Sequence, residues 1–151
     1  MSTVLTRPST PEVLLHYLES YQTIKDLAAG GVFWGPASED AKQLGCISIT
    51  EIPDASPEAT GLVVRARLTV RCTAPSVEHG ERLYREVCKA LDWYGGRLVL
   101  AQPSWGRSVV LHSLRVVGGP TNRPSDPQSN VWEGSMTIEA LIGTIDTSEG
   151  A

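Results

Sequence analysis

Three arginines at alternating positions are the side chains of this sequence best suited to recognise a charged group. Residues 61–73 alternate in polarity, so Arg65, Arg67 and Arg71 share one face of a predicted strand whose other face is apolar. Guanidinium groups donate paired hydrogen bonds to carboxylates and phosphates. Two interpretations stay open: a solvated face on which the arginines pair with Glu133 and Glu139 of the last strand, or a face that lines an interface or a channel.

Catalytic motifs are missing from the sequence. It contains no G-x-S-x-G elbow, no G-x-x-x-x-G-K-[ST] phosphate loop, no H-E-x-x-H, and no G-x-G-x-x-G after a strand. The three histidines, His16, His79 and His112, fall on different predicted elements. We therefore expect a protein that is not an enzyme, with no catalytic residues, no metal and no cofactor. A small hydrolase that uses His112 as its base remains an alternative.

The three cysteines have no spacing that is typical of metal ligands. Cys46, Cys72 and Cys88 are odd in number and include no C-x2-C pair. Cys72 and Cys88 fall at positions with apolar neighbours on the same predicted face. The pattern predicts buried free thiols in a reducing compartment.

Length and composition are those of one globular domain. The chain has 151 residues, of which 41% are hydrophobic and 20% charged. We expect 1–151 to be a single domain, with a loose arm at 1–9, a core at 10–145 and a flexible tail at 146–151. The net charge of −4 argues against a nucleic-acid binder but leaves room for a local basic face. No signal peptide or long apolar run is present, which predicts a soluble protein that is not secreted.

The predicted elements alternate between helices and strands. Helices are predicted at 11–20, with Thr10 as N-cap, at 21–29 as an extension or a second short helix, and from Pro75 or Ser76 to about Trp93, ended by Gly95 and Gly96. Strands are predicted at 32–34, 46–52, 61–73, 97–101, 108–117 and 131–145, and connections at 36–44, 53–60, 102–106 and 118–130.

This order predicts an α+β fold. Its antiparallel or mixed sheet would have about 5–6 strands, with the N-terminal helix and one long helix packed on one face. Strands 46–52 and 61–73 would pair antiparallel across their loop. In strand 108–117, the residues Val110, His112, Leu114 and Val116 are predicted to face opposite to Val109, Leu111, Ser113 and Arg115.

Further candidates for an interface lie beside turns and in the long loop. Trp34 and Trp105 neighbour turn residues, where a tryptophan is either a core plug at the sheet edge or an interface anchor. Trp93 and Trp132 fit the core by their spacing. A polar loop of the length of 118–130 is often functional or mobile, and its residues Asn122, Arg123 and Asp126 join the three arginines and Trp34 and Trp105 as candidates for a subunit or lumen interface.

The order of elements resembles the tail terminator proteins of long-tailed bacteriophages, also called tail completion or minor tail proteins. The resemblance covers about residues 10–145. It includes the N-terminal helix, the strands Gly-Val-Phe and Cys-Ile-Ser-Ile-Thr-Glu, and the strand Arg-Ala-Arg-Leu-Thr-Val-Arg-Cys that leads into the helix Glu-His-Gly-Glu-Arg-Leu-Tyr-Arg-Glu-Val-Cys-Lys-Ala-Leu. The last strand, Val-Trp-Glu-Gly-Ser-Met-Thr-Ile-Glu-Ala, completes it. The longer segment 118–130 departs from the short-loop versions.

The resemblance implies a structural protein of the virion. Members of the family form a homo-hexameric ring that caps the tail tube, stops its polymerisation and joins it to the head-side connector. The implied partners are further copies of the chain, the tail tube protein and the head-tail connector protein, with non-specific passage of DNA and no membrane. The implied location is the tail or neck of the virion, after assembly in the host cytoplasm. The alternatives are a small α+β ligand-binding or regulatory domain acting as a dimer, or another neck or tail-tube component.

Overall fold

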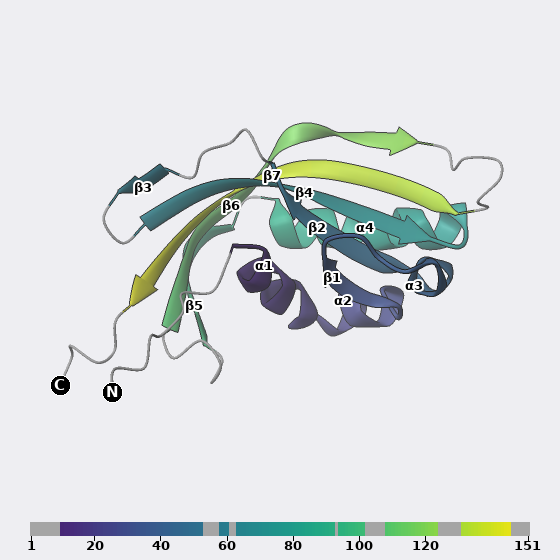
Figure 1. Cartoon of the computed structure of the whole chain (residues 1–151), viewed down its shortest axis with the longest axis horizontal. Coiled ribbons are helices and arrows are strands. Elements are labelled where there is room, and N and C mark those ends of the chain that lie inside the picture. The colour runs from purple at the N-terminus through teal and green to yellow at the C-terminus, as the bar shows by residue number, and fades with distance from the viewer. Residues whose placement is uncertain are drawn as a thin grey trace.

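A mixed sheet with helices on one face forms the described part of the protein (Figure 1). The structure is a computed structural model, and it describes residues 10–52, 58–60, 63–92, 94–101, 108–123 and 131–145. The helices are α1 (Thr10–Glu19), α2 (Gln22–Leu27), α3 (Glu39–Leu44) and α4 (Val77–Leu91). The strands are β1 (Gly31–Trp34), β2 (Cys46–Glu51), β3 (Glu58–Thr60), β4 (Val63–Ala74), β5 (Tyr94–Ala101), β6 (Ser108–Arg123) and β7 (Trp132–Ile145).

The sheet places β4 and β7, the first and last long strands, side by side at its centre. Its order is β1-β2-β4-β7-β6-β5, and β3 pairs with one end of β4. β1 and β2 are parallel and are joined through α3, whereas all the other described pairs are antiparallel. The α+β prediction and the pairing of 46–52 with 61–73 are therefore confirmed, in a sheet of seven described strands.

The core lies between the sheet and the helices, and the alternation of β4 determines which residues enter it. Ala66, Leu68, Val70 and Cys72 are buried, whereas Arg65, Arg67 and Arg71 are exposed, as the sequence predicts. α4 packs against this face of the sheet with its buried residues, which are Gly80, Leu83, Val87, Ala90 and Leu91. The buried Tyr17 hydroxyl of α1 donates a 2.8 Å hydrogen bond to the Ala90 carbonyl, which ties the first helix to the last.

Two glycines make room for the largest side chain in this layer. Trp132, which is only 6% exposed, lies against Gly80 of α4 and Gly134 of β7. A Cβ atom on Gly80 would lie 2.2 Å from Trp132 Cε3, and one on Gly134 would lie 2.6 Å from Trp132 Cη2. Tyr84 packs edge-to-face on the same indole, with ring centroids 5.9 Å apart. The prediction that Trp132 belongs to the core is confirmed, while Trp93 lies outside the described residues.

A short helix replaces the polar connection that was predicted for 36–44. α3 begins after Ser38, whose hydroxyl accepts a 3.2 Å hydrogen bond from the Ala41 N–H. Glu39 and Asp40 follow in the first turn, where carboxylates interact favourably with the helix dipole. Ser-Glu-Asp is an N-terminal helix signal, so the prediction of a polar connection was wrong for the residues of α3. The predicted loop 53–60 is likewise too long, because its last three residues form β3.

The long helix ends earlier than predicted, and the two glycines beyond it belong to a strand. α4 ends at Leu91, and Asp92 leaves it in an extended conformation rather than the left-handed one that glycine favours. Gly95 and Gly96 lie in β5, at a register shift between Gly95 and Leu98 in its pairing with β6. The glycines thus accommodate a bulge, which sequence spacing does not distinguish from a helix stop.

Strand β6 is longer and less regular than predicted. Its bulge between Leu111 and Ser113 reverses the alternation, so Val109 and Leu111 enter the core before it and Leu114 after it. The prediction that Val110 and His112 share a face with Leu114 and Val116 is therefore wrong. The strand continues to Arg123, with further register shifts on both sides of Gly118, so the predicted loop 118–130 is also wrong for 118–123. Residues 124–130 lie outside the described part, as do the predicted arm, turn 102–106 and tail.

Candidate interaction surface

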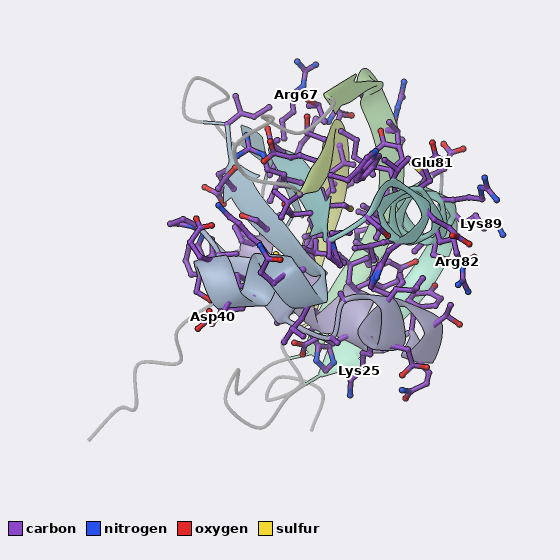
Figure 2. The ribbon with its side chains drawn as sticks, turned by 90° about the vertical axis from the view of Figure 1, so that its right-hand side faces the viewer. Lys25, Asp40, Arg67, Glu81, Arg82 and Lys89 are labelled. Carbon is purple, nitrogen blue, oxygen red and sulfur yellow. The ribbon has the colours of Figure 1, made fainter. Side chains whose placement is uncertain are left out.

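The face of the sheet opposite the helices carries the three predicted arginines. On β4, Arg65, Arg67 and Arg71 point away from the core, and in the register of β7 the residue directly opposite Arg67 is Glu139. Figure 2 shows Arg67 projecting from the top of the molecule, away from the helices. The sequence therefore places these three side chains correctly on one surface.

Ion pairs connect the arginines to the last strand. Glu139 lies between two of them, with its carboxylate oxygens 3.6 Å from Arg67 Nε and 3.9 Å from Arg65 Nε. Arg71 Nε lies 3.3 Å from a Glu133 carboxylate oxygen. The interpretation in which the arginines pair with acids of the last strand is confirmed in these contacts. Each such pair contributes no more than about 1 kcal/mol, because the guanidinium groups are in water.

These pairs do not remove the arginines from contact with solvent. The three arginine side chains are 56–57% exposed, whereas Glu139 beneath two of them is 18% exposed. On β6, Arg115 is exposed and occupies the register position opposite Glu139 on its other side. We call this surface the arginine face; its charged residues with described side chains are Arg65, Arg67, Arg71, Arg115, Glu133 and Glu139. Four cations against two carboxylates leave it with a surplus of two positive charges.

The remaining predicted interface residues do not all reach this surface. Trp34 is 57% exposed, but it lies on β1 at the far edge of the sheet. The backbones of Asn122 and Arg123 lie at the end of β6, where Arg123 is in register with Glu133. Trp105 and Asp126 lie outside the described residues. The structure thus brings the arginines together and separates Trp34 from them.

A second surface, which sequence reasoning missed, lies where α3 ends and α4 begins. Leu44 is 57% exposed and Val77 is 61% exposed, and both are next to a contact between the two helices. That contact joins Gly45 to His79, whose Nε2 atom also lies within hydrogen-bond distance of the Leu27 carbonyl oxygen. The first turns of both helices carry exposed carboxylates, and we call this surface the acidic end; its residues are Glu39, Asp40, Leu44, Val77 and Glu78.

Helix signals in the sequence mark each of the two helix starts that make up the acidic end, but not their proximity. Ser38 and Ser76 are both N-caps, and each is followed within two residues by a carboxylate in the first turn. Lys42 is the one lysine of α3, and its Nζ atom lies 3.2 Å from Glu39. With Lys42 included, the acidic end keeps a surplus of two negative charges.

A groove of about 400 Å³ runs beside the outer side of α4. It is lined by Tyr84, Cys88 and Trp132, with Glu81 and Arg85 at its rim. Burial raises the pKa of the Cys88 thiol, and burial together with the neighbouring Cys88 and Cys72 thiols raises the pKa of Tyr84 to about 12. The Cys88 Sγ atom lies 3.9 Å from Met136 Sδ. A thiol of raised pKa is a weak nucleophile at neutral pH, so this groove is not equipped for thiolate chemistry.

We expect the folded protein to lose stability above about pH 9. Complete burial raises the pKa of Cys72 above its ordinary value of 9.0, so in the folded state the thiol stays protonated at a pH where the unfolded chain ionises. Unfolding then releases a proton, and the free energy of unfolding falls by about 1.4 kcal/mol per pH unit for each such group. Urea denaturation between neutral pH and about pH 10 measures this slope. Cys72→Ala should reduce this slope by the contribution of one proton, about 1.4 kcal/mol per pH unit. An unchanged slope would mean that the Cys72 thiol is not the group that loses its proton on unfolding.

The histidines lie on three separate elements. His16 is on α1, His79 on α4 and His112 at the bulge of β6. Within the described ranges, no group of three or more His, Cys, Asp and Glu side chains is arranged to hold a metal ion. Of the helices that the structure describes, none has the length and hydropathy required to span a membrane.

Comparisons with known proteins relate the chain to others through its fold. No protein-family model matches the sequence, and no curated protein matches it either. Among solved structures, the fold is similar to that of a chain from the virion of a native gene transfer agent (GTA) particle, with a TM-score of 0.56 and 15% sequence identity. The match covers 85% of this chain and 90% of that chain. The similarity therefore extends over most of both chains.

Proposed function

We propose that the chain is a structural protein of a virion, and within that class a tail terminator. In this role, copies of the chain form a hexameric ring in the tail or neck, which caps the tail tube and joins it to the head-side connector. The observation that carries the proposal is the fold shared with a chain of a GTA virion over most of both chains. The order of elements, which resembles that of tail terminators, supports the finer assignment.

The surfaces of the molecule suit such a role. A closed ring needs two different patches on each subunit, because the contact between neighbours is head-to-tail. The arginine face and the acidic end are two such surfaces on different sides of the described structure. The tail tube protein and the connector would bind above and below the ring, and DNA would pass through it without sequence recognition. No catalytic step, metal or cofactor belongs to this proposal.

The mass of the assembly and its effect on tail tubes test the proposal. Native mass spectrometry over a range of concentrations is expected to show one closed species of six copies, and negative-stain images should show rings. Tube protein polymerised with the chain should give tubes that carry a ring at one end and stop growing. Tube protein alone, at the same concentration, is the control. A monomer or dimer under every condition, including with tube protein present, would refute the ring.

A further inference from the structure

We propose that neighbouring copies in the assembly contact each other by placing the acidic end of one copy on the arginine face of the next. This inference rests on the proposed ring and names its subunit contact. The partner of the arginine face is therefore a second copy of the chain. The contact is heterologous, since the two surfaces differ, and repetition of such a contact closes a ring when the rotation between copies allows it.

Charge complementarity is the first argument. The arginine face has a surplus of two positive charges, although the whole chain carries −4. The acidic end has a surplus of two negative charges, on Glu39, Asp40 and Glu78 with Lys42 included. Glu39 is accessible to a partner even though it pairs with Lys42, because its side chain is 82% exposed. Opposite charges on two surfaces steer association and determine which surfaces meet.

The apolar side chains of the two surfaces are complementary as well. Stable protein contacts have an apolar centre within a polar rim. At the acidic end, Leu44 and Val77 are more than half exposed, and their helices also carry the exposed carboxylates of Asp40 and Glu78. On the arginine face, Val117 of β6 is 39% exposed, and Leu141 of β7 lies in register with Arg65. Both surfaces therefore offer apolar contact area next to charges of opposite sign.

A two-fold dimer through the arginine face is disfavoured by the same charges. An isologous contact would bring the four arginines of each copy onto those of the other. The two carboxylates compensate little, since both are less exposed than the arginines: Glu139 is 18% and Glu133 38% exposed, whereas the arginine side chains are 56–57% exposed. A second copy would meet guanidinium groups first, and juxtaposed like charges oppose binding.

Charge reversal and mixing test the contact. The face-reversed variant is Arg67→Glu/Arg115→Glu, and the end-reversed variant is Asp40→Lys/Glu78→Lys. We expect each variant alone to raise the Kd of self-association at least about tenfold, and an equimolar mixture of the two to recover wild-type assembly. Where the two variants alternate in the assembly, each negative face meets a positive end, and each positive face meets a negative end. Sedimentation velocity at low and high salt measures the assembly, and the wild type should weaken as salt rises.

Matched variants separate the contact from folding and from total charge. The control variant Glu19→Lys/Asp26→Lys changes the net charge by the same amount as the end-reversed variant does. Its two substitutions are at exposed helix positions outside the acidic end, so it should assemble as the wild type does. Circular dichroism and thermal unfolding establish that each variant folds. For any that does not, the neutral pairs Arg67→Gln/Arg115→Gln and Asp40→Asn/Glu78→Gln replace the reversals, each with an expected loss of assembly.

The outcomes distinguish this inference from the proposed function. If wild-type rings form but neither reversal affects them, the ring stands and the contact is wrong. If the mixture fails to recover assembly, the contact is also wrong. If only the face reversal matters, and that variant binds the wild type better than itself, the contact is two-fold. If the wild type binds duplex DNA through these arginines and does not self-associate, both proposals fail.

Discussion

Replacing Gly80 with alanine is expected to destabilise the protein by about 2–3 kcal/mol. At an ordinary helix position the same change would stabilise by about 1 kcal/mol, because alanine is the better helix former. Here the new Cβ atom would lie 2.2 Å from Trp132 Cε3 and 2.4 Å from Cδ2. The indole cannot rotate freely, since Gly134 and Tyr84 pack against it. Either the helix moves away from the sheet or Trp132 leaves the core.

A double-mutant cycle tests this expectation. Urea denaturation of Gly80→Ala, Trp132→Leu and the double variant gives the coupling between the two positions. The double variant should be more stable than the sum of the single effects predicts, because leucine leaves space for the added methyl group. Glu81→Ala, at the exposed neighbouring position of the same helix, should change stability little. Additive effects at the two positions would mean that Gly80 is not needed for the packing of Trp132.

Gly30→Ala is expected to cost about 3 kcal/mol or more, for a different reason. A Cβ atom on Gly30 would lie 2.3 Å from the Ala41 carbonyl oxygen and 2.8 Å from the Gly45 carbonyl oxygen. Both are backbone atoms of the connection that carries the chain through α3 to β2, so no rotamer change can relieve the clash. The Gly30 N–H also donates a 2.8 Å hydrogen bond to the Gly45 carbonyl, which movement would break.

Gly35→Ala is the matched control for Gly30→Ala. Gly35 has φ = +102°, but beyond its own residue and its two chain neighbours no heavy atom lies within 4 Å of where its Cβ would be, so alanine there costs only the backbone strain of about 1 kcal/mol. Thermal and urea denaturation of the two variants should rank Gly30→Ala as clearly the less stable. An equal loss in both would show that the α3 connection moves to accept the methyl group.

Sequence patterns predict the parts of the fold in which one face of an element is buried. The alternation of β4 and the helical spacing of α4 are strong because each element has one buried face. The same alternation in β4 and β7 places Arg67 and Glu139 on one face, and the register of the two strands then makes them direct neighbours. The confirmed prediction, that Arg65, Arg67 and Arg71 share one exposed surface, depends only on this periodicity.

The missed features depend on contacts that periodicity does not report. The bulge at Leu111 shifts one strand against its partner, and the alternation of a single strand cannot show where this occurs. Gly95 and Gly118 are typical of turns, but antiparallel partners supply the hydrogen bonds that hold both in strands. The acidic end combines two helix starts that are about 40 residues apart, so only the contact between Gly45 and His79 brings them together.

The edge of the sheet at β1 bears on whether many copies can be held close together without aggregating. Exposed edge strands are templates for unlimited strand addition between molecules. β1 is only four residues long, and Gly31 at its start and Gly35 just after its end both have positive φ values, 112° and 102°. At both ends the backbone therefore turns out of the extended conformation that an added strand would need. Copies of the chain at high local concentration can thus associate through their side chains, while strand addition at the β1 edge is disfavoured.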